Sequence, residues 1–264
     1  MDNFWNRMPP VTKNLLIINV LVWLAMVIMP VGFDRAVTRS CALHYFLSPD
    51  FKPWQLLTYM FMHATRGIFM TQQSIDISHL FFNMFGLVMF GSVLEHVFGS
   101  KRYLFFYLTV GIGAALIQEG VYAIWIHNLA SGLPEGWTLS TVVEPNPQFI
   151  KENLQDITPE MVKICEKIYD LIDTPTVGAS GALYGILLGF AMLFPNMPLY
   201  FFFIPVPIKA KWMVLGYGVI ELFFGVTGLQ SGVAHFAHLG GMLVALLLIL
   251  YWRKNGEINR GPLY

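Results

Sequence analysis

Four polar side chains in three apolar stretches of the sequence could together carry out acyl transfer. Ser180 lies between small residues at the start of one stretch, and His238 lies near the start of another. A serine hydroxyl is a weak nucleophile until an adjacent imidazole accepts its proton. His79 and Asn83 are four residues apart in a third stretch, so a helix would present both on one face. With the Ser180 backbone N–H, they could donate the hydrogen bonds that stabilise an oxyanion.

Small residues beside the serine and the histidine would let two helices approach closely. Gly241 and Ala245 lie three and seven residues beyond His238, on the same helical face. After Ser180, glycines recur every four residues, at Gly181, Gly185 and Gly189. Such ridges of small residues allow close backbone contact between helices in lipid. We therefore expect Gly241 and Ala245 to meet Gly185 and Gly189. This contact favours His238 as the base.

The composition places these residues in a membrane. The chain has 264 residues, of which 56% are hydrophobic and 12% charged, whereas roughly 25% of residues are charged in an ordinary soluble domain. The mean hydropathy is +0.58, so we expect an integral membrane protein. The net charge of zero gives no indication of nucleic-acid binding. Two cysteines are too few for a disulfide framework or a cysteine metal cluster, and we expect no cofactor and no metal.

Six apolar segments are long enough to be predicted as transmembrane helices, at residues 14–29, 77–98, 103–126, 176–194, 211–228 and 236–252. Lys and Arg flank one set of connections, whereas the long connection 127–175 is dominated by acidic residues. The excess of basic residues on one side predicts that both termini are cytoplasmic. The second, fourth and sixth helices then all start at the outer face. His79, Ser180 and His238 are therefore expected at one depth, near that face.

The segments between the spans give the domain organisation. We expect a cytoplasmic tail, a membrane domain and a second cytoplasmic tail over residues 1–13, 14–252 and 253–264. Within the long acidic connection, Thr158 followed by Pro159 is typical of a helix start. Apolar residues then recur at helical spacing, which predicts an amphipathic surface helix at about 159–172. Structural cover of the membrane domain is its expected role.

Three motifs, taken together and in this order, resemble the rhomboid family of intramembrane serine proteases. They are His79-x-x-x-Asn83, Gly178-Ala-Ser-Gly181 and Ala237-His-x-x-Gly241. The resemblance extends over residues 14–252. It implies an all-α membrane protein, a bundle of six transmembrane helices. It also implies a membrane-inserted first loop and a large extracytoplasmic loop between helices 3 and 4.

The resemblance also implies roles for individual residues. It assigns Ser180 and His238 to a catalytic dyad that needs no third acidic residue, with His79 and Asn83 at the oxyanion. By the same match Tyr184 packs on the catalytic histidine, and three glycines support the site, Gly178, Gly181 and Gly241. The implied substrates are transmembrane proteins in the lipid bilayer, with no nucleic acid. The implied location is a bacterial inner (plasma) membrane, and nothing in the sequence indicates an oligomeric state.

The sequence departs from the family pattern in the first loop. The family has Trp-Arg where this chain has Trp54-Gln55, which removes a guanidinium that could anchor the loop. The stretch 64–77 is also longer than usual for the family. Both differences concern loop geometry and substrate access, and neither removes a residue of the expected dyad.

Two other functions are compatible with parts of the sequence. One is a catalytically silent rhomboid-like binding or quality-control protein, which would be expected to lack the serine or the base. The other is a metal or proton transporter that uses the polar residues of the spans, His79, His235, His238 and Glu221. Within the protease hypothesis, His235 is the second candidate base. Glu221, Gln118 and Glu119 are expected to form hydrogen bonds between helices.

Overall fold

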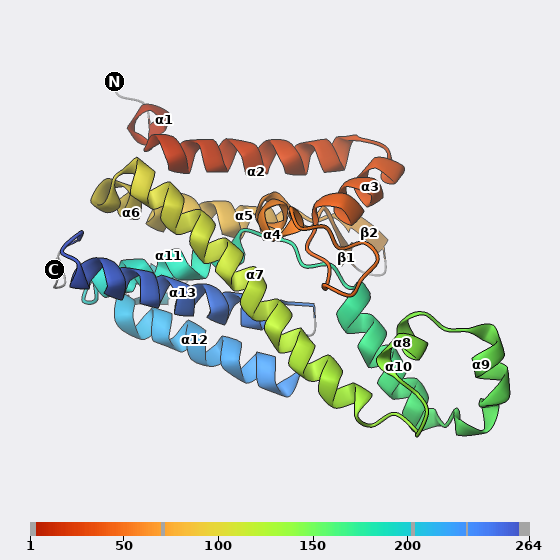
Figure 1. Cartoon of the computed structure of the whole chain (residues 1–264). Helices are drawn as coiled ribbons and strands as arrows, with labels where there is room; N and C mark the ends of the chain where they lie inside the picture. Colours follow the sequence, from red (N-terminus) through yellow and green to blue (C-terminus); the bar gives the residue numbers. More distant parts are fainter. Residues whose placement is uncertain (1–3, 70–71, 202–203, 231, 259–264) are drawn as a thin grey trace.

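The structure is a computed structural model in which residues 4–69, 72–201, 204–230 and 232–258 are described. Helices that lie side by side form most of the molecule (Figure 1). The predicted tails, residues 1–13 and 253–264, fall partly outside the described residues. Within the described part, the start of α2 and the end of α13 lie at the same end of the bundle (Figure 1).

Five helical stretches of the described residues have the length and hydropathy of a membrane span. They are α2 (Pro10–Ile28), the stretch Ser78–Phe98, α7 (Ser100–Ala130), α12 (Ala210–Thr227) and α13 (His235–Lys254). The chain is therefore an integral membrane protein built mainly of α-helices. The fourth of the predicted spans corresponds to α11 (Ser180–Leu193), which has only 14 residues. At 1.5 Å per residue it is about 21 Å long, shorter than the hydrocarbon core of about 30 Å.

The second span is not a regular helix. It consists of α5 (Ser78–Gly86), a π-helical turn η2 (Leu87–Gly91) and α6 (Ser92–Phe98). At its far end, Glu95 accepts hydrogen bonds from the backbone N–H groups of Val11 and Thr12, at 3.0 and 2.7 Å. The Ser100 hydroxyl also donates to Glu95, at 2.6 Å. One carboxylate thus binds free N–H groups at the start of α2 and a side chain at the start of α7, where a negative charge is favourable.

Helix α11 lies inside the bundle, against α7, α12 and α13 (Figure 1). Glycines set its distance from α13. A Cβ atom on Gly241 would lie 1.9 Å from the Gly181 carbonyl oxygen, and one on Gly185 would lie 2.9 Å from the Gly241 oxygen. Gly241 therefore packs between Gly181 and Gly185, and Gly185 also meets Ala245, as expected. Gly189 instead faces Leu94 and Ile249.

The first loop, between the first two spans, packs on the start of α11. It contains α3 (Val31–Cys41), α4 (Gln55–Thr58), the 3₁₀ turn η1 (Tyr59–Phe61) and the antiparallel hairpin of β1 (Arg66–Phe69) and β2 (Gln72–Ile75). Leu43 and Thr176 exchange two backbone hydrogen bonds, of 3.0 and 2.8 Å. The Gly178 N–H donates to the Tyr59 carbonyl, at 3.0 Å. The loop therefore holds the segment that leads into Ser180 in an extended conformation.

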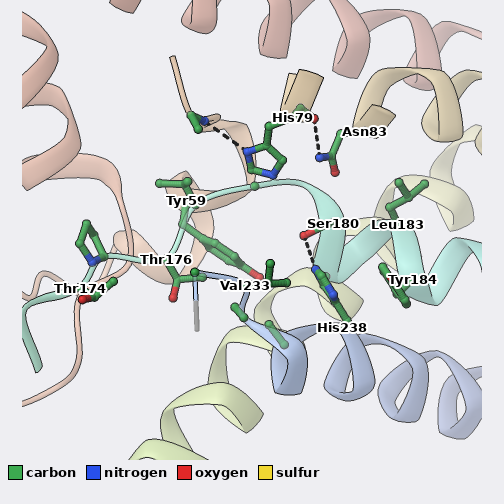
Figure 2. A pocket seen from close by; sticks show the side chains of 18 of the residues that line it. Tyr59, His79, Asn83, Thr174, Thr176, Ser180, Leu183, Tyr184, Val233 and His238 are labelled. Atoms are coloured by element: carbon green, nitrogen blue, oxygen red, sulfur yellow. Dashed lines mark hydrogen bonds between the residues drawn. The ribbon is translucent and has the colours of Figure 1, made fainter. Parts of the chain in front are cut away.

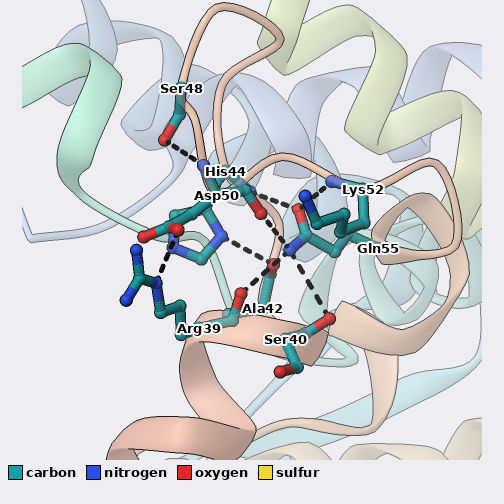
Figure 3. A network of polar contacts seen from close by, with 8 residues as sticks. All are labelled: Arg39, Ser40, Ala42, His44, Ser48, Asp50, Lys52 and Gln55. Carbon is teal, nitrogen blue, oxygen red and sulfur yellow. Dashed lines mark hydrogen bonds and ion pairs between the residues drawn. The ribbon is translucent and has the colours of Figure 1, made fainter.

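Gln55 anchors this loop from its interior (Figure 3). Its side chain is fully buried. Its Oε1 accepts from the backbone N–H groups of His44 and Lys52, at 3.2 and 3.1 Å. Its Nε2 donates to the carbonyls of Arg39 and Asp50, at 3.2 and 2.9 Å. The glutamine amide thus provides an anchor at the position where the family has an arginine, and we call this set of residues the loop network.

The connection between α7 and α11 is largely helical. It contains α8 (Leu139–Val143), α9 (Pro147–Glu152), the short η3 (Leu154–Asp156) and the longer α10 (Pro159–Asp173). The Thr158 hydroxyl caps α10 by accepting from the Met161 N–H, at 3.2 Å. Ile168 and Ile172 of α10 are buried in one cluster with Ile126 of α7. This helical segment lies beside the far end of α7, away from the termini (Figure 1).

The remaining described elements are short. Helix α1 (Phe4–Arg7) precedes α2, and the antiparallel strands β3 (Pro198–Phe201) and β4 (Ile204–Lys209) connect α11 to α12. Pro198 pairs with Lys209 at the open end of this hairpin. The two hairpins found among the described residues were not expected from the sequence. They lie in connections and leave the helical bundle unchanged.

Candidate active site

Ser180 and His238 are in direct contact. Ser180 is the first residue of α11, and His238 lies in the first turn of α13. The distance from Ser180 Oγ to His238 Nε2 is 2.7 Å, which is a hydrogen bond (Figure 2). His238 is 8% exposed, whereas Ser180 is half-buried and lines a cavity. The contact follows from the backbone packing of Gly241 on Gly181, because these glycines lie one to three residues from the two polar side chains.

The backbone two residues before the serine helix requires a glycine. Gly178 has φ of +127°, a value that L-residues rarely adopt. A Cβ atom at Gly178 would lie 3.0 Å from His79 Nε2 and 3.5 Å from Ser180 Oγ. A side chain there would therefore be strained and would fill the space between the histidine and the serine.

His79 and Asn83 line the same cavity as Ser180, which has a volume of about 470 Å³ (Figure 2). His79 Nδ1 accepts from the Ala64 N–H, at 3.3 Å, so the neutral ring carries its proton on Nε2. That nitrogen faces Gly178 and the serine side of the cavity. Asn83 Nδ2 donates to the His79 carbonyl, at 2.8 Å, and an amide nitrogen has a second hydrogen to donate. Both side chains can therefore present an N–H group to the cavity.

Tyr184 covers one face of the His238 ring. The two ring centres are 4.2 Å apart and the planes differ by 3°, so the rings are stacked. Tyr184 lies one turn after Ser180 on α11. Its hydroxyl donates to Glu221 of α12. One helix thus supplies both the hydroxyl that meets the imidazole and the ring that orients it.

Glu221 connects the two histidines of α13. Its Oε2 is 2.6 Å from His235 Nδ1, and its Oε1 is 3.1 Å from His238 Nδ1. His235 also faces the Gln230 carbonyl through Nε2, at 3.3 Å. Both nitrogens of His235 therefore have partners other than Ser180, and the structure places His238 at the serine instead. Glu221 was expected only to bond between helices, although an ionisable residue in a span is a signal of function.

Two further expectations concern metals and the acidic residue of α7. The donor atoms of Glu221, His235 and His238 lie within 4.8 Å of one another, so among the described residues this cluster could hold a divalent ion. Within this cluster, Glu221 Oε2 is already paired with His235 Nδ1, whereas His238 Nδ1 lies 3.1 Å from Glu221 Oε1. Glu119 lies outside the site, where it accepts from the Phe46 N–H of the first loop, at 3.1 Å. Glu119 thus links α7 to a loop, whereas a hydrogen bond between helices was expected.

Comparison with known proteins gives consistent matches. Residues 50–255 match the rhomboid domain. The chain is 31% identical over 182 residues to RHOMBOID-like protein 12, mitochondrial, of Arabidopsis thaliana, covering 68% of this chain and 44% of the relative. It is 25% identical over 182 residues to Rhomboid protein 1, mitochondrial, of Saccharomyces cerevisiae, covering 69% and 40%. It is 26% identical over 254 residues to Rhomboid protease AarA of Providencia stuartii, covering 91% and 72%. The chain thus spans less than half the length of the first two relatives.

Proposed function

The chain belongs to the rhomboid family, and from that premise we propose that it is a serine endopeptidase that cleaves transmembrane segments of membrane proteins. The observation that carries the proposal is the hydrogen bond of 2.7 Å between Ser180 and His238. A relative named as a rhomboid protease supports a hydrolytic activity. We assign Ser180 as nucleophile and His238 as general base.

The geometry supports a complete acyl-transfer cycle. As Ser180 Oγ attacks the scissile carbonyl carbon, His238 Nε2 accepts the hydroxyl proton. The resulting oxyanion lies within reach of N–H groups from His79, Asn83 and the Ser180 backbone, which is a free helix N-terminus. Collapse of the tetrahedral intermediate breaks the C–N bond, and the imidazolium protonates the leaving amine. Water then hydrolyses the acyl-enzyme with the same imidazole as base, which regenerates Ser180.

The position of Ser180 bears on the form in which a substrate can bind. A regular transmembrane helix keeps its carbonyls within its own hydrogen bonds, so a substrate segment must unwind locally to expose one. The cavity beside Ser180 is lined in part by the extended residues Thr174, Pro175 and Thr176. An unwound peptide can lie along this segment. We therefore assign as substrates membrane proteins whose helices unwind easily near one membrane face.

The orientation and location are part of the same proposal. We place both ends of the chain in the cytoplasm, as tails 1–13 and 253–264 around a membrane domain 14–252, and the site near the outer face. Basic residues at one end of the bundle and acidic residues between α7 and α11 support this orientation. The relatives are bacterial and mitochondrial. For this chain we assign a bacterial inner membrane.

Cleavage of a model transmembrane substrate tests the function. We expect the purified protein in detergent or liposomes to cleave it, and Ser180→Ala to abolish cleavage while the melting temperature is kept. A fluorophosphonate probe should label the wild type and leave Ser180→Ala unlabelled, since the probe reacts with activated serines. Cleavage that persists in Ser180→Ala would overturn the serine mechanism. Loss of wild-type cleavage on adding a chelator would support metal chemistry instead.

A further inference from the structure

We propose that Glu221 is a positioning residue for His238 and forms, with it and Ser180, a three-residue catalytic chain. The inference rests on the proposed function and goes beyond the two-residue dyad that the family resemblance implies. Three helices of the bundle, α11, α12 and α13, contribute one residue each. The arrangement is that of a nucleophile, a base and a carboxylate that orients the base.

The tautomer of His238 is the first argument. To accept the Ser180 proton, His238 Nε2 must carry a lone pair, so the neutral ring carries its hydrogen on Nδ1. Nδ1 is buried and has no aligned hydrogen-bond partner among the described residues. The carboxylate oxygen of Glu221 lies 3.1 Å away, an ion-pair distance. A small rotation of this carboxylate aligns the contact and stabilises the Nδ1–H, most strongly when the ring becomes an imidazolium.

The second argument is that the carboxylate is held in place from its other sides. The Tyr184 hydroxyl donates to Oε1, and His235 Nδ1 lies 2.6 Å from Oε2. Tyr184 also stacks on the His238 ring. The two groups that orient His238, the tyrosine ring and the carboxylate, are therefore joined by a hydrogen bond. Glu221, His235, His238 and Tyr184 therefore form a closed set of contacts, which we call the site network.

The third argument is the cost of the residue. A carboxylate in a transmembrane helix is unfavourable by several kcal/mol unless it is paired. Glu221 is 7% exposed, and the pair with His235 alone would be sufficient to bind two helices. A purely structural pair would not require Glu221 to approach His238 as well. Glu221 nevertheless lies 3.1 Å from Nδ1, the ring nitrogen that does not face Ser180. This contact assigns Glu221 to the reaction.

Kinetics of Glu221 variants test the inference. Loss of the acid lowers kcat by roughly 10⁴-fold in Ser-His-Asp triads. Because Tyr184 also orients His238, we expect Glu221→Gln to lower kcat by roughly 10²-fold, with KM changed by less than about threefold. The rate of Ser180 labelling by a fluorophosphonate should fall in parallel. Glu221→Asp should restore at least a tenth of the wild-type kcat, because the charge is kept.

A matched control separates positioning from stability. Glu119 is also buried in a spanning helix, at 1% exposure, but contacts the first loop. We expect Glu119→Gln to lower the melting temperature and to leave the labelling rate of Ser180 near wild type. All assays are run at least 10 °C below the melting temperature of the least stable variant. If Glu221→Gln does not fold, the kcat of Glu221→Asp and the labelling rate of Tyr184→Phe, which removes a donor to the carboxylate, decide the inference.

Each outcome is decisive. If Glu221→Gln keeps the wild-type kcat and labelling rate while Ser180→Ala is inactive, Glu221 does not position the base and the proposed function stands. If Ser180→Ala still cleaves, the proposed function itself fails. If zinc chloride inhibits the wild type and Glu221→Gln removes this inhibition without lowering kcat, the cluster is a metal site, and positioning is excluded.

Discussion

Two buried polar networks of this protein differ in what their protons can do. The loop network is built on the uncharged Gln55 amide, which bonds to backbone atoms in fixed donor and acceptor roles. The site network, in α11 to α13, bonds side chain to side chain. It contains two imidazoles and a carboxylate, whose protons can move. Backbone bonding fixes a shape, whereas side chains that exchange protons can perform a reaction.

The comparison explains why Gln55 is suited to its place. An amide has both donors and acceptors, and here it accepts from two backbone N–H groups and donates to backbone carbonyls. An arginine has five donors and no acceptor, so it could not satisfy the same N–H groups. The glutamine therefore satisfies backbone donors and acceptors alike, and it leaves no net charge in a buried position.

The largest effect is expected from removing the base. His238→Ala should lower kcat for a transmembrane substrate by roughly 10³-fold or more, because Ser180 loses the group that accepts its proton. The loss of kcat in His235→Ala should be at least tenfold smaller, since His235 contacts the Glu221 carboxylate and not Ser180. Cleavage rates of the two purified variants check this. A larger loss in His235→Ala would mean that the wrong imidazole was assigned as base.

The next effect concerns the helix contact that brings the site network to the serine. Gly241→Ala should destabilise the protein by about 3 kcal/mol, because its Cβ would lie 1.9 Å from the Gly181 carbonyl. Thermal melting in detergent measures this. Gly216→Ala is the matched control, since a Cβ there meets nothing within 4 Å. Equal melting temperatures for the two variants would contradict the close packing of α11 and α13.

A smaller effect is expected in the loop network, and it should fall on stability instead of chemistry. Gln55→Leu should lower the free energy of unfolding by about 2 kcal/mol, because buried backbone groups lose their partners. Below the melting temperature, Ser180 should still react with a fluorophosphonate. Gln55→Arg should not restore the stability, because arginine offers no acceptor. A loss of Ser180 labelling at unchanged stability would remove the distinction between the two networks.

The smallest effect is expected outside both networks. Thr158→Ala removes the side-chain cap of α10 and should cost about 1 kcal/mol, with no change in kcat. Melting curves and cleavage rates together measure this background level. A change in kcat would show that the helical segment between α7 and α11 acts on the site.

The sequence predicted more of the site than of its surroundings. Ser180 and His238 are revealed by polarity in apolar stretches and by glycine spacing, since both signals depend on local pattern. The serine helix was predicted to begin at residue 176, but Thr176 is not helical because it pairs with Leu43 of the first loop. The two hairpins were also missed, because their short strands lack a strong alternating pattern.

Glu221 shows why part of the site could not be predicted. Whether its side chain meets His238 depends on the rotation of α12 about its axis, and packing against α11 and α13 determines that rotation. The sequence gives only the type of residue and its presence in a span. Gln55 is a second example, since its partners come from five positions of the loop, and no local pattern specifies the path of that loop.

The π turn at residues 87–91 determines which way the two halves of the second span, α5 and α6, face relative to each other. Before it, His79 and Asn83 face the cavity, and after it Glu95 faces the start of α2. A π turn contains one extra residue, which rotates everything beyond it by about 100° relative to a continuous α-helix. Deleting one residue there would make the helix regular. Either the cavity residues or Glu95 would then point away from their present partners. The π turn thus lets one span contribute to the cavity at one end and bind the start of α2 at the other.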